Sequence, residues 1–160
     1  FSSGPKKSLA EMRLLTVEVL EAKNLVKCTK TGDSDPHLHV YLTDLAVREV
    51  KKESFQCTPK QKTLKPKWNE KFTFGVHYNL DTDGELPALN LVMTHKASYS
   101  VSEVPMGEIL IELDTIDPNG EETDLWYPLG LSGRMKQVTG EVHLKIKFSR
   151  PVTPAVKAGD

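Results

Sequence analysis

This sequence of 160 residues is poor in cysteine, in net charge and in long apolar runs. No segment approaches the ~20 consecutive apolar residues of a membrane-spanning helix. Two cysteines, Cys28 and Cys57, are too few for a disulfide scaffold. Since no secretion signal precedes them, a reducing compartment is favoured over a disulfide. The formal net charge of −1 argues against attraction of nucleic acid to the whole surface.

The signatures of common catalytic sites are also missing. The five histidines are scattered singly, and no nucleophile elbow or phosphate-binding glycine loop is present. His37 and His39 share one face of a predicted strand and could bind a metal ion together, but the sequence offers no evident third ligand. We therefore expect a noncatalytic domain without a resident cofactor.

Alternating apolar and polar residues recur in eight short segments separated by turns rich in Gly, Pro, Asn and Asp. The predicted strands are Met12–Leu20, His37–Thr43, Glu53–Pro59, Glu70–Val76, Ala88–His95, Gly107–Leu113, Asp124–Leu129 and Gly140–Phe148. A helical turn is expected near Leu113–Ile116. This pattern predicts an all-β, eight-stranded antiparallel β-sandwich over residues 10–150, with disordered flanks at 1–9 and 151–160. Because the chain begins with Phe1, we expect a domain of a longer protein.

Two polar turns each lead directly into a predicted strand. They are Gly32–Pro36, with the sequence GDSDP, and Thr63–Glu70, with the sequence TLKPKWNE. Together with the first strand, Met106-Gly107 and the segment Trp126–Leu129, in this order and spacing, they resemble the C2 domain. The resemblance covers Leu14 to Phe148, and the late strand Gly140–Phe148 looks like the type II permutation. It implies a module that docks on membranes and proteins.

The resemblance also indicates which calcium ligands are missing. Calcium-binding C2 domains place five acidic residues in two loops at one end of the sandwich. Here three of those positions fall on Thr29, His95 and Ala97 or a neighbour, and Lys96 adds a positive charge. The remaining carboxylates are Asp33, Asp35 and Glu103. Because calcium prefers about six to eight oxygen ligands, we expect no functional calcium site, and we expect Asp35 to cap its own turn.

Positive charge is concentrated between Arg48 and Lys71, which hold eight cations and three acids, whereas residues 108–124 hold seven acids and no Lys or Arg. The resemblance implies that such a basic patch meets anionic headgroups, each cation contributing up to ~1 kcal/mol. The positions of the usual phosphoinositide-selective lysines fall on Gln56 and Thr58. The predicted lipid-binding residues are Arg48, Lys51, Lys52, Lys60, Lys62, Lys65, Lys67, Lys96 and Tyr99.

Three interpretations of the basic segment stay open: lysines that block edge pairing of strands, contact with anionic lipid, and contact with an acidic protein. The leading hypothesis is calcium-independent peripheral binding to anionic membranes, which positions a larger cytoplasmic protein in trafficking or signalling. The first rival is a protein-interaction domain without lipid affinity, acting through the acidic residues 108–124 or a sheet edge. The second rival is a weak calcium-dependent phospholipid binder.

Overall fold

The computed structural model describes residues 10–44, 49–79, 86–96, 102–131 and 138–151. Its strands are β1 Ala10–Lys23, β2 Pro36–Asp44, β3 Glu49–Gln56, β4 Lys67–Asn79, β5 Ala88–His95, β6 Val104–Glu112, β7 Thr123–Pro128 and β8 Glu141–Phe148. A short 3-10 helix, η1, covers Leu113–Thr115. No helix in the described part of the chain is long and apolar enough to cross a membrane.

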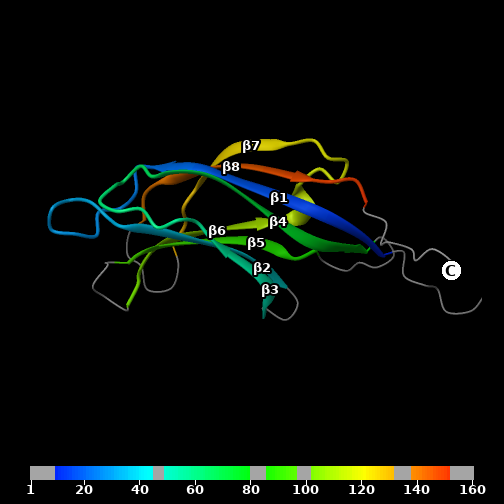
Figure 1. Ribbon diagram of the computed structural model, residues 1–160, viewed down its shortest axis with the longest axis horizontal. Helices are drawn as coiled ribbons and strands as arrows, with labels where there is room; N and C mark the ends of the chain where they lie inside the picture. Colours follow the sequence, from blue (N-terminus) through cyan, green and yellow to red (C-terminus); the bar gives the residue numbers. More distant parts are fainter. Residues whose placement is uncertain (1–9, 45–48, 80–85, 97–101, 132–137, 152–160) are drawn as a thin grey trace, which may run out of the picture.

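The strands form two four-stranded antiparallel sheets, one in the order β4-β1-β8-β7 and the other in the order β3-β2-β5-β6 (Figure 1). This arrangement confirms the predicted all-β sandwich of eight strands. The strand order does not establish the type II permutation. The predicted flank 1–9 lies outside the described residues, as does all of 151–160 except Pro151, so their disorder stays a prediction.

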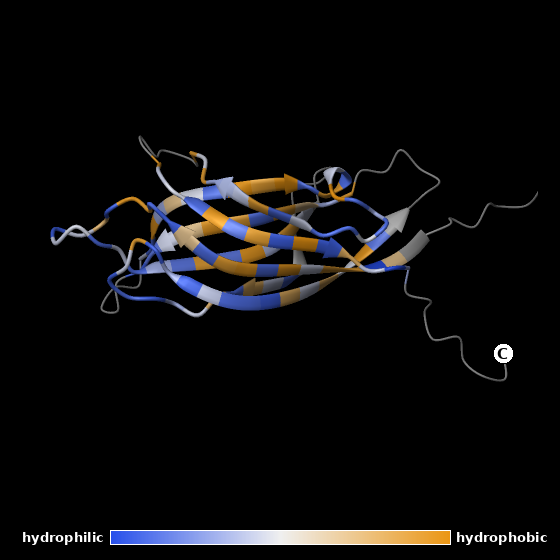
Figure 2. Cartoon of the chain, turned by 90° about the horizontal axis from the view of Figure 1, so that it is seen from above, coloured by the Kyte–Doolittle hydropathy of each residue, from blue (hydrophilic) through white to orange (hydrophobic). Residues whose placement is uncertain are grey.

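The core follows from the alternation along each strand, which buries one face and exposes the other. Leu15, Val17 and Val19 of β1 are fully buried, and Thr16 and Glu18 between them are not. Apolar and polar residues alternate along most strands in Figure 2. The ring of Phe55 stacks on Phe72 at 5.1 Å and meets Phe74 edge-on at 5.0 Å, which joins β3 to β4 across the two sheets.

Every predicted strand overlaps an observed one, and the start of β3 differs most from the prediction. β5 has the predicted bounds, and η1 confirms the helical turn expected near Leu113–Ile116. β3 covers Glu49–Gln56 instead of the predicted Glu53–Pro59. Beyond Gln56 the chain leaves the regular ladder, where Pro59 has no amide hydrogen to donate. The prediction began too late because three of the four residues 49–52 are charged, as suits the edge strand that β3 is.

Candidate functional site

The two turns singled out in the sequence meet at one end of the sandwich. We call this end the loop end and define it as the described residues 24–35, 57–66 and 96. The Thr63 amide donates to the carbonyl of Ser34 at 2.9 Å, and the Leu25 amide donates to the carbonyl of Leu64 at 3.2 Å. Figure 1 shows the two loops side by side at the same end of the strands. The motifs therefore build one structure.

The first loop is closed by Ser34, which is fully buried. Its hydroxyl donates to the carbonyl of Val26 at 2.6 Å and accepts from the amide of Cys28 at 3.0 Å. Gly32 adopts φ +87°, a left-handed conformation that glycine takes without steric cost. These features explain the Gly-x-Ser pattern by local folding.

Asp35 connects this loop to two other segments. Its carboxylate accepts from the backbone amide of Lys62 at 2.7 Å. Its own amide donates to Nδ1 of His95 at 2.9 Å, and its carbonyl accepts from the amide of Lys96 at 3.1 Å. The expectation that Asp35 caps its own turn is therefore wrong. The carboxylate instead satisfies an amide 27 residues further along the chain.

Hydrogen bonds with the first loop and with β4 fix residues 57–66, which we call the lysine loop. Lys62 has φ 51°, an uncommon left-handed conformation for a lysine, and the Asp35 carboxylate fixes its amide. The indole of Trp68, which is 6% exposed, donates to the carbonyl of Thr58 at 2.8 Å. The carboxylate of Glu70 accepts from the Thr58 amide at 2.9 Å. The Pro-x-Trp-Asn-Glu motif thus fixes the start of the loop.

The three remaining candidate calcium ligands are engaged separately. Asp33 accepts from the hydroxyl of Thr29 at 2.6 Å within its own loop, and Asp35 accepts from Lys62. Glu103 accepts from the hydroxyl of Thr94 at 2.7 Å. Among the described residues, the only group of three His, Cys, Asp or Glu side chains close enough to share a metal ion is a different one, His37, His39 and Glu103.

Glu103 stays ionised because of these contacts. The hydrogen bond from Thr94 is the largest cause that lowers the pKa of Glu103 to about 2. Partial burial opposes this by raising the pKa, and the hydrogen bonds with His39 and His37 lower it further. A carboxylate that accepts several hydrogen bonds favours its charged form.

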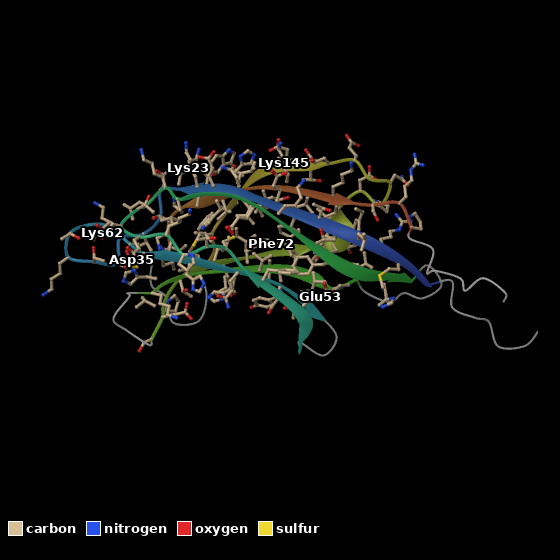
Figure 3. The ribbon with its side chains drawn as sticks, in the orientation of Figure 1. Lys23, Asp35, Glu53, Lys62, Phe72 and Lys145 are labelled. Atoms are coloured by element: carbon tan, nitrogen blue, oxygen red, sulfur yellow. The ribbon has the colours of Figure 1, made fainter. Side chains whose placement is uncertain are left out.

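The predicted lysine patch divides into two groups. Lys60, Lys62 and Lys65 lie in the lysine loop, and Lys96 follows β5 at the same end. Figure 3 shows Lys62 and Asp35 together at this end and Glu53 of β3 far from it. The other members are on edge strands or outside the described residues: Lys51 and Lys52 on β3, Lys67 on β4, and Arg48 and Tyr99 in segments that the structure does not describe.

Two lysines of the loop end were missed by the sequence reasoning. Lys27 and Lys30 are exposed in the first loop. They were missed because they are far in sequence from the basic segment, although both closely precede the GDSDP turn. The described residues of the loop end therefore carry six lysines, namely Lys27, Lys30, Lys60, Lys62, Lys65 and Lys96.

A shallow groove of about 390 Å³ lies where the two loops meet. It is lined by Lys23, Asn24, Asp33, Lys62, Thr63, Leu64 and Lys65. Lys62 and Lys65 face one acid, Asp33, which is already hydrogen-bonded to Thr29. The ammonium of Lys23 lies 3.8 Å from a carboxylate oxygen of Glu141 and above the ring of Trp126. A groove of this kind suits an anionic group.

A larger hollow of about 590 Å³ lies on the outer face of the sheet β4-β1-β8-β7. Its cations are Lys71, Lys145, Lys147 and Arg150, and its acids are Glu18 and Glu122. Glu18 pairs across the sheet with Lys71 on one side and Lys145 on the other. Opposite charges placed directly across a sheet offset one another. We regard this hollow as less electropositive than the loop end for that reason.

The acidic segment 108–124 lies along β6, η1 and the start of β7. β6 is an edge strand of one sheet and β7 of the other. Val104 and Leu110 of β6 are 49% and 55% exposed, so this edge combines acids with exposed apolar side chains. The protein-interaction hypothesis depends on this acidic edge of the sandwich as the surface that would contact a partner.

The profile of the C2 domain family matches residues 13–129 of the chain. The chain belongs to the C2 domain family. Over 117 residues, 72% of this chain, it is 44% identical to human synaptotagmin-2. It is also 28% identical to tricalbin-2 of Saccharomyces cerevisiae over 144 residues, 89% of this chain. The matched part spans 25% of the first relative and 11% of the second.

Solved structures have the same fold. A calcium-bound structure of two C2 domains of Extended-Synaptotagmin 2 matches 89% of this chain, and the match covers 47% of that chain. The TM-score is 0.65 at 19% sequence identity. C2 domains are generally noncatalytic, which agrees with the absence of a catalytic motif in the sequence.

Proposed function

We propose that this C2 domain binds anionic phospholipid membranes without calcium and so positions a larger cytoplasmic protein at a membrane surface. The observation that carries the proposal is the bond from the Lys62 amide to the Asp35 carboxylate. The residue that would hold calcium in the first loop is used to shape the lysine loop. Membrane affinity would then come from fixed cations.

The charges of the loop end support this reading. Lys62, Lys65 and Lys96 are exposed, and no hydrogen bond or ion pair of their ammonium groups is found within the described residues. Each lysine near an anionic surface contributes about 1 kcal/mol, a contribution that salt screens. Three to six such lysines give an affinity that depends strongly on ionic strength. We include Arg48 and Tyr99 in the proposed surface on sequence grounds alone.

Calcium binding by Extended-Synaptotagmin 2 supports the opposite alternative, a weak calcium site in this chain. Against it, Thr29 and His95 stand at two of the family's acidic positions. The hydroxyl of Thr29 donates to Asp33, and the Nδ1 atom of His95 accepts from the amide of Asp35. Both substitutions thus stabilise the loops through contacts that need no ion.

The test is sedimentation of the domain with vesicles of phosphatidylserine and phosphatidylcholine, compared with phosphatidylcholine alone, in chelator at two salt concentrations. We expect binding only to the anionic vesicles, and weaker binding at high salt. Equal binding to neutral vesicles would refute the electrostatic mechanism. No binding in any condition would favour the protein-interaction role of the acidic edge at 108–124.

A further inference from the structure

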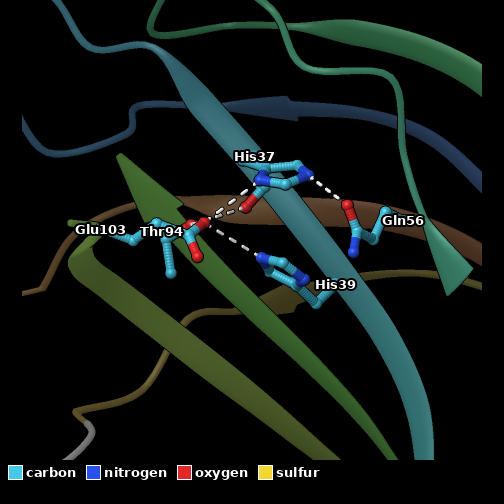
Figure 4. Close-up of polar contacts among 5 residues, drawn as sticks. All are labelled: His37, His39, Gln56, Thr94 and Glu103. Carbon is cyan, nitrogen blue, oxygen red and sulfur yellow. Dashed lines mark hydrogen bonds and ion pairs between the residues drawn. The ribbon is translucent and has the colours of Figure 1, made fainter. Parts of the chain in front are cut away.

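We propose that His37, His39 and Glu103 form a binding site for a divalent transition-metal ion, of which Zn²⁺ is the probe. The site shares Glu103 with the family's calcium-loop positions, but it uses neither Asp33 nor Asp35 and none of the loop-end lysines. It lies on the outer face of the sheet β3-β2-β5-β6, beside the loop end (Figure 4). His37 and His39 alone were recognised in the sequence as a metal-binding pair without a third ligand.

The strand register supplies the third ligand. Leu38 and Val40 are fully buried, so His37 and His39 point to the opposite, outer face of β2. β5 pairs with β2 so that Thr94 lies opposite His37, and β5 also pairs with β6. Glu103 immediately precedes β6 and is thereby carried to the two imidazoles.

The distances between the ligand atoms suit a small metal ion. Oε1 of Glu103 lies 3.1 Å from Nδ1 of His37 and 3.2 Å from Nε2 of His39. All three ligand atoms lie within 4.8 Å of one another. A tetrahedral Zn²⁺ ion with bonds of about 2.0–2.1 Å separates its ligand atoms by roughly 3.3–3.4 Å. Two of the three separations are therefore close to the required value without rearrangement.

Two neighbouring side chains orient these ligands. Oε1 of Gln56 lies 2.9 Å from Nε2 of His37, the ring nitrogen that faces away from Glu103. When the Nε2–H group of His37 donates a hydrogen bond to Gln56, Nδ1 of His37 keeps its lone pair for a metal. Thr94 donates to the Glu103 carboxylate at 2.7 Å. Metal ligands are characteristically held by such outer contacts.

The ligand set selects the class of ion, and the site has a route to solvent. Two imidazoles and one carboxylate suit Zn²⁺ and related ions, whereas Ca²⁺ needs more oxygens. The side chains of His39 and Glu103 are 24% and 32% exposed, and that of His37 is 7% exposed. An ion can therefore enter from the side of His39, and the open fourth position is available to water.

The experiment is calorimetric titration of the whole domain with Zn²⁺, with Ca²⁺ as the comparison ion, before and after His39→Gln and Glu103→Gln. The control is His143→Gln, since His143 also lies beside a carboxylate, with Nε2 at 2.5 Å from Asp124, but on the other sheet. The side chains replaced in the two site variants are partly exposed, and circular dichroism checks that the variants fold.

We expect one Zn²⁺ per domain, no comparable response to Ca²⁺, and at least tenfold weaker Zn²⁺ binding in each site variant but not in the control. Cobalt substitution gives a second readout, since tetrahedral Co²⁺ shows intense visible bands that either variant should remove. No Zn²⁺ binding to the unmodified domain would overturn the proposal and leave the cluster as a hydrogen-bonded one. Unchanged binding in both variants, or loss only in the control, would also overturn it.

Discussion

The loop end and the outer face of the sheet β3-β2-β5-β6 use carboxylates in opposite ways. At the loop end, Asp33 and Asp35 accept from separate loop segments, from a hydroxyl and a backbone amide, and do not converge. On the outer face, one oxygen of Glu103 lies within 3.2 Å of both imidazoles. A cation can bind where several ligand atoms converge. The number of acids in a loop does not decide this.

The largest expected effect comes from removing charge at the loop end. The triple variant Lys60→Ala, Lys62→Ala, Lys65→Ala should lose roughly 100-fold in affinity for anionic vesicles, because each lysine contributes about 1 kcal/mol. Vesicle sedimentation measures the change. The matched control is the triple variant Lys71→Ala, Lys145→Ala, Lys147→Ala in the larger hollow on the sheet β4-β1-β8-β7. This control should bind the vesicles almost as the parent domain does.

If only the control variant lost affinity for the vesicles, the membrane-binding surface would lie on the sheet β4-β1-β8-β7. Equal losses in both sets would show that net charge alone decides binding. Either result would contradict the role proposed for the loop end.

The second effect concerns the stability of the loop end. Asp35→Ala removes the acceptor of the exposed Lys62 amide and should cost about 0.5–1.5 kcal/mol in the free energy of unfolding. Asp35→Asn keeps an oxygen acceptor at the same place and should cost less. Urea denaturation distinguishes the two. A penalty for Asn as large as that for Ala would indicate that the charge of the carboxylate, and not the hydrogen bond alone, holds the loop.

A third, smaller effect is expected at Lys96. Lys96→Ala should weaken binding to anionic vesicles about fivefold, the equivalent of about 1 kcal/mol, and should flatten the dependence on salt. The measurement is sedimentation across a series of salt concentrations. Tighter binding in this variant when calcium is added would mean that Lys96 normally repels an ion from the loops.

The smallest effect is expected at Asp33. Its carboxylate accepts from Thr29 and Thr31 within one exposed loop, so Asp33→Ala should cost less than about 1 kcal/mol in the free energy of unfolding. Vesicle binding should rise slightly, since a negative charge leaves the groove beside Lys62 and Lys65. Weaker binding in this variant would show that the groove does not receive an anion.

Much of the fold could be predicted from the sequence, because alternation along a strand is a local property. β5 and η1 were placed correctly for this reason. The bounds of β3 were wrong, since an edge strand tolerates polar residues on both faces and shows little alternation. The association of the GDSDP and TLKPKWNE turns with a C2 domain was confirmed by the family match.

The site was less predictable, because its contacts join segments far apart in the chain. The bond from Asp35 to Lys62 spans 27 residues, and that from His37 to Glu103 spans 66. No local pattern marks Glu103 as a partner of His37, since the contact depends on the pairing of three strands. The basic segment was treated as one patch because its lysines are close in sequence, whereas β3 carries Lys51 and Lys52 along an edge and away from the lysine loop.

The most direct test of the account is sedimentation of the unmodified domain with phosphatidylserine vesicles, first in excess chelator and then in excess calcium at the same ionic strength. We expect equal binding in the two conditions, since Asp33, Asp35 and Glu103 are each hydrogen-bonded to other protein groups. Binding that occurs only with calcium would contradict it, because these carboxylates would then have to leave their partners and converge on an ion.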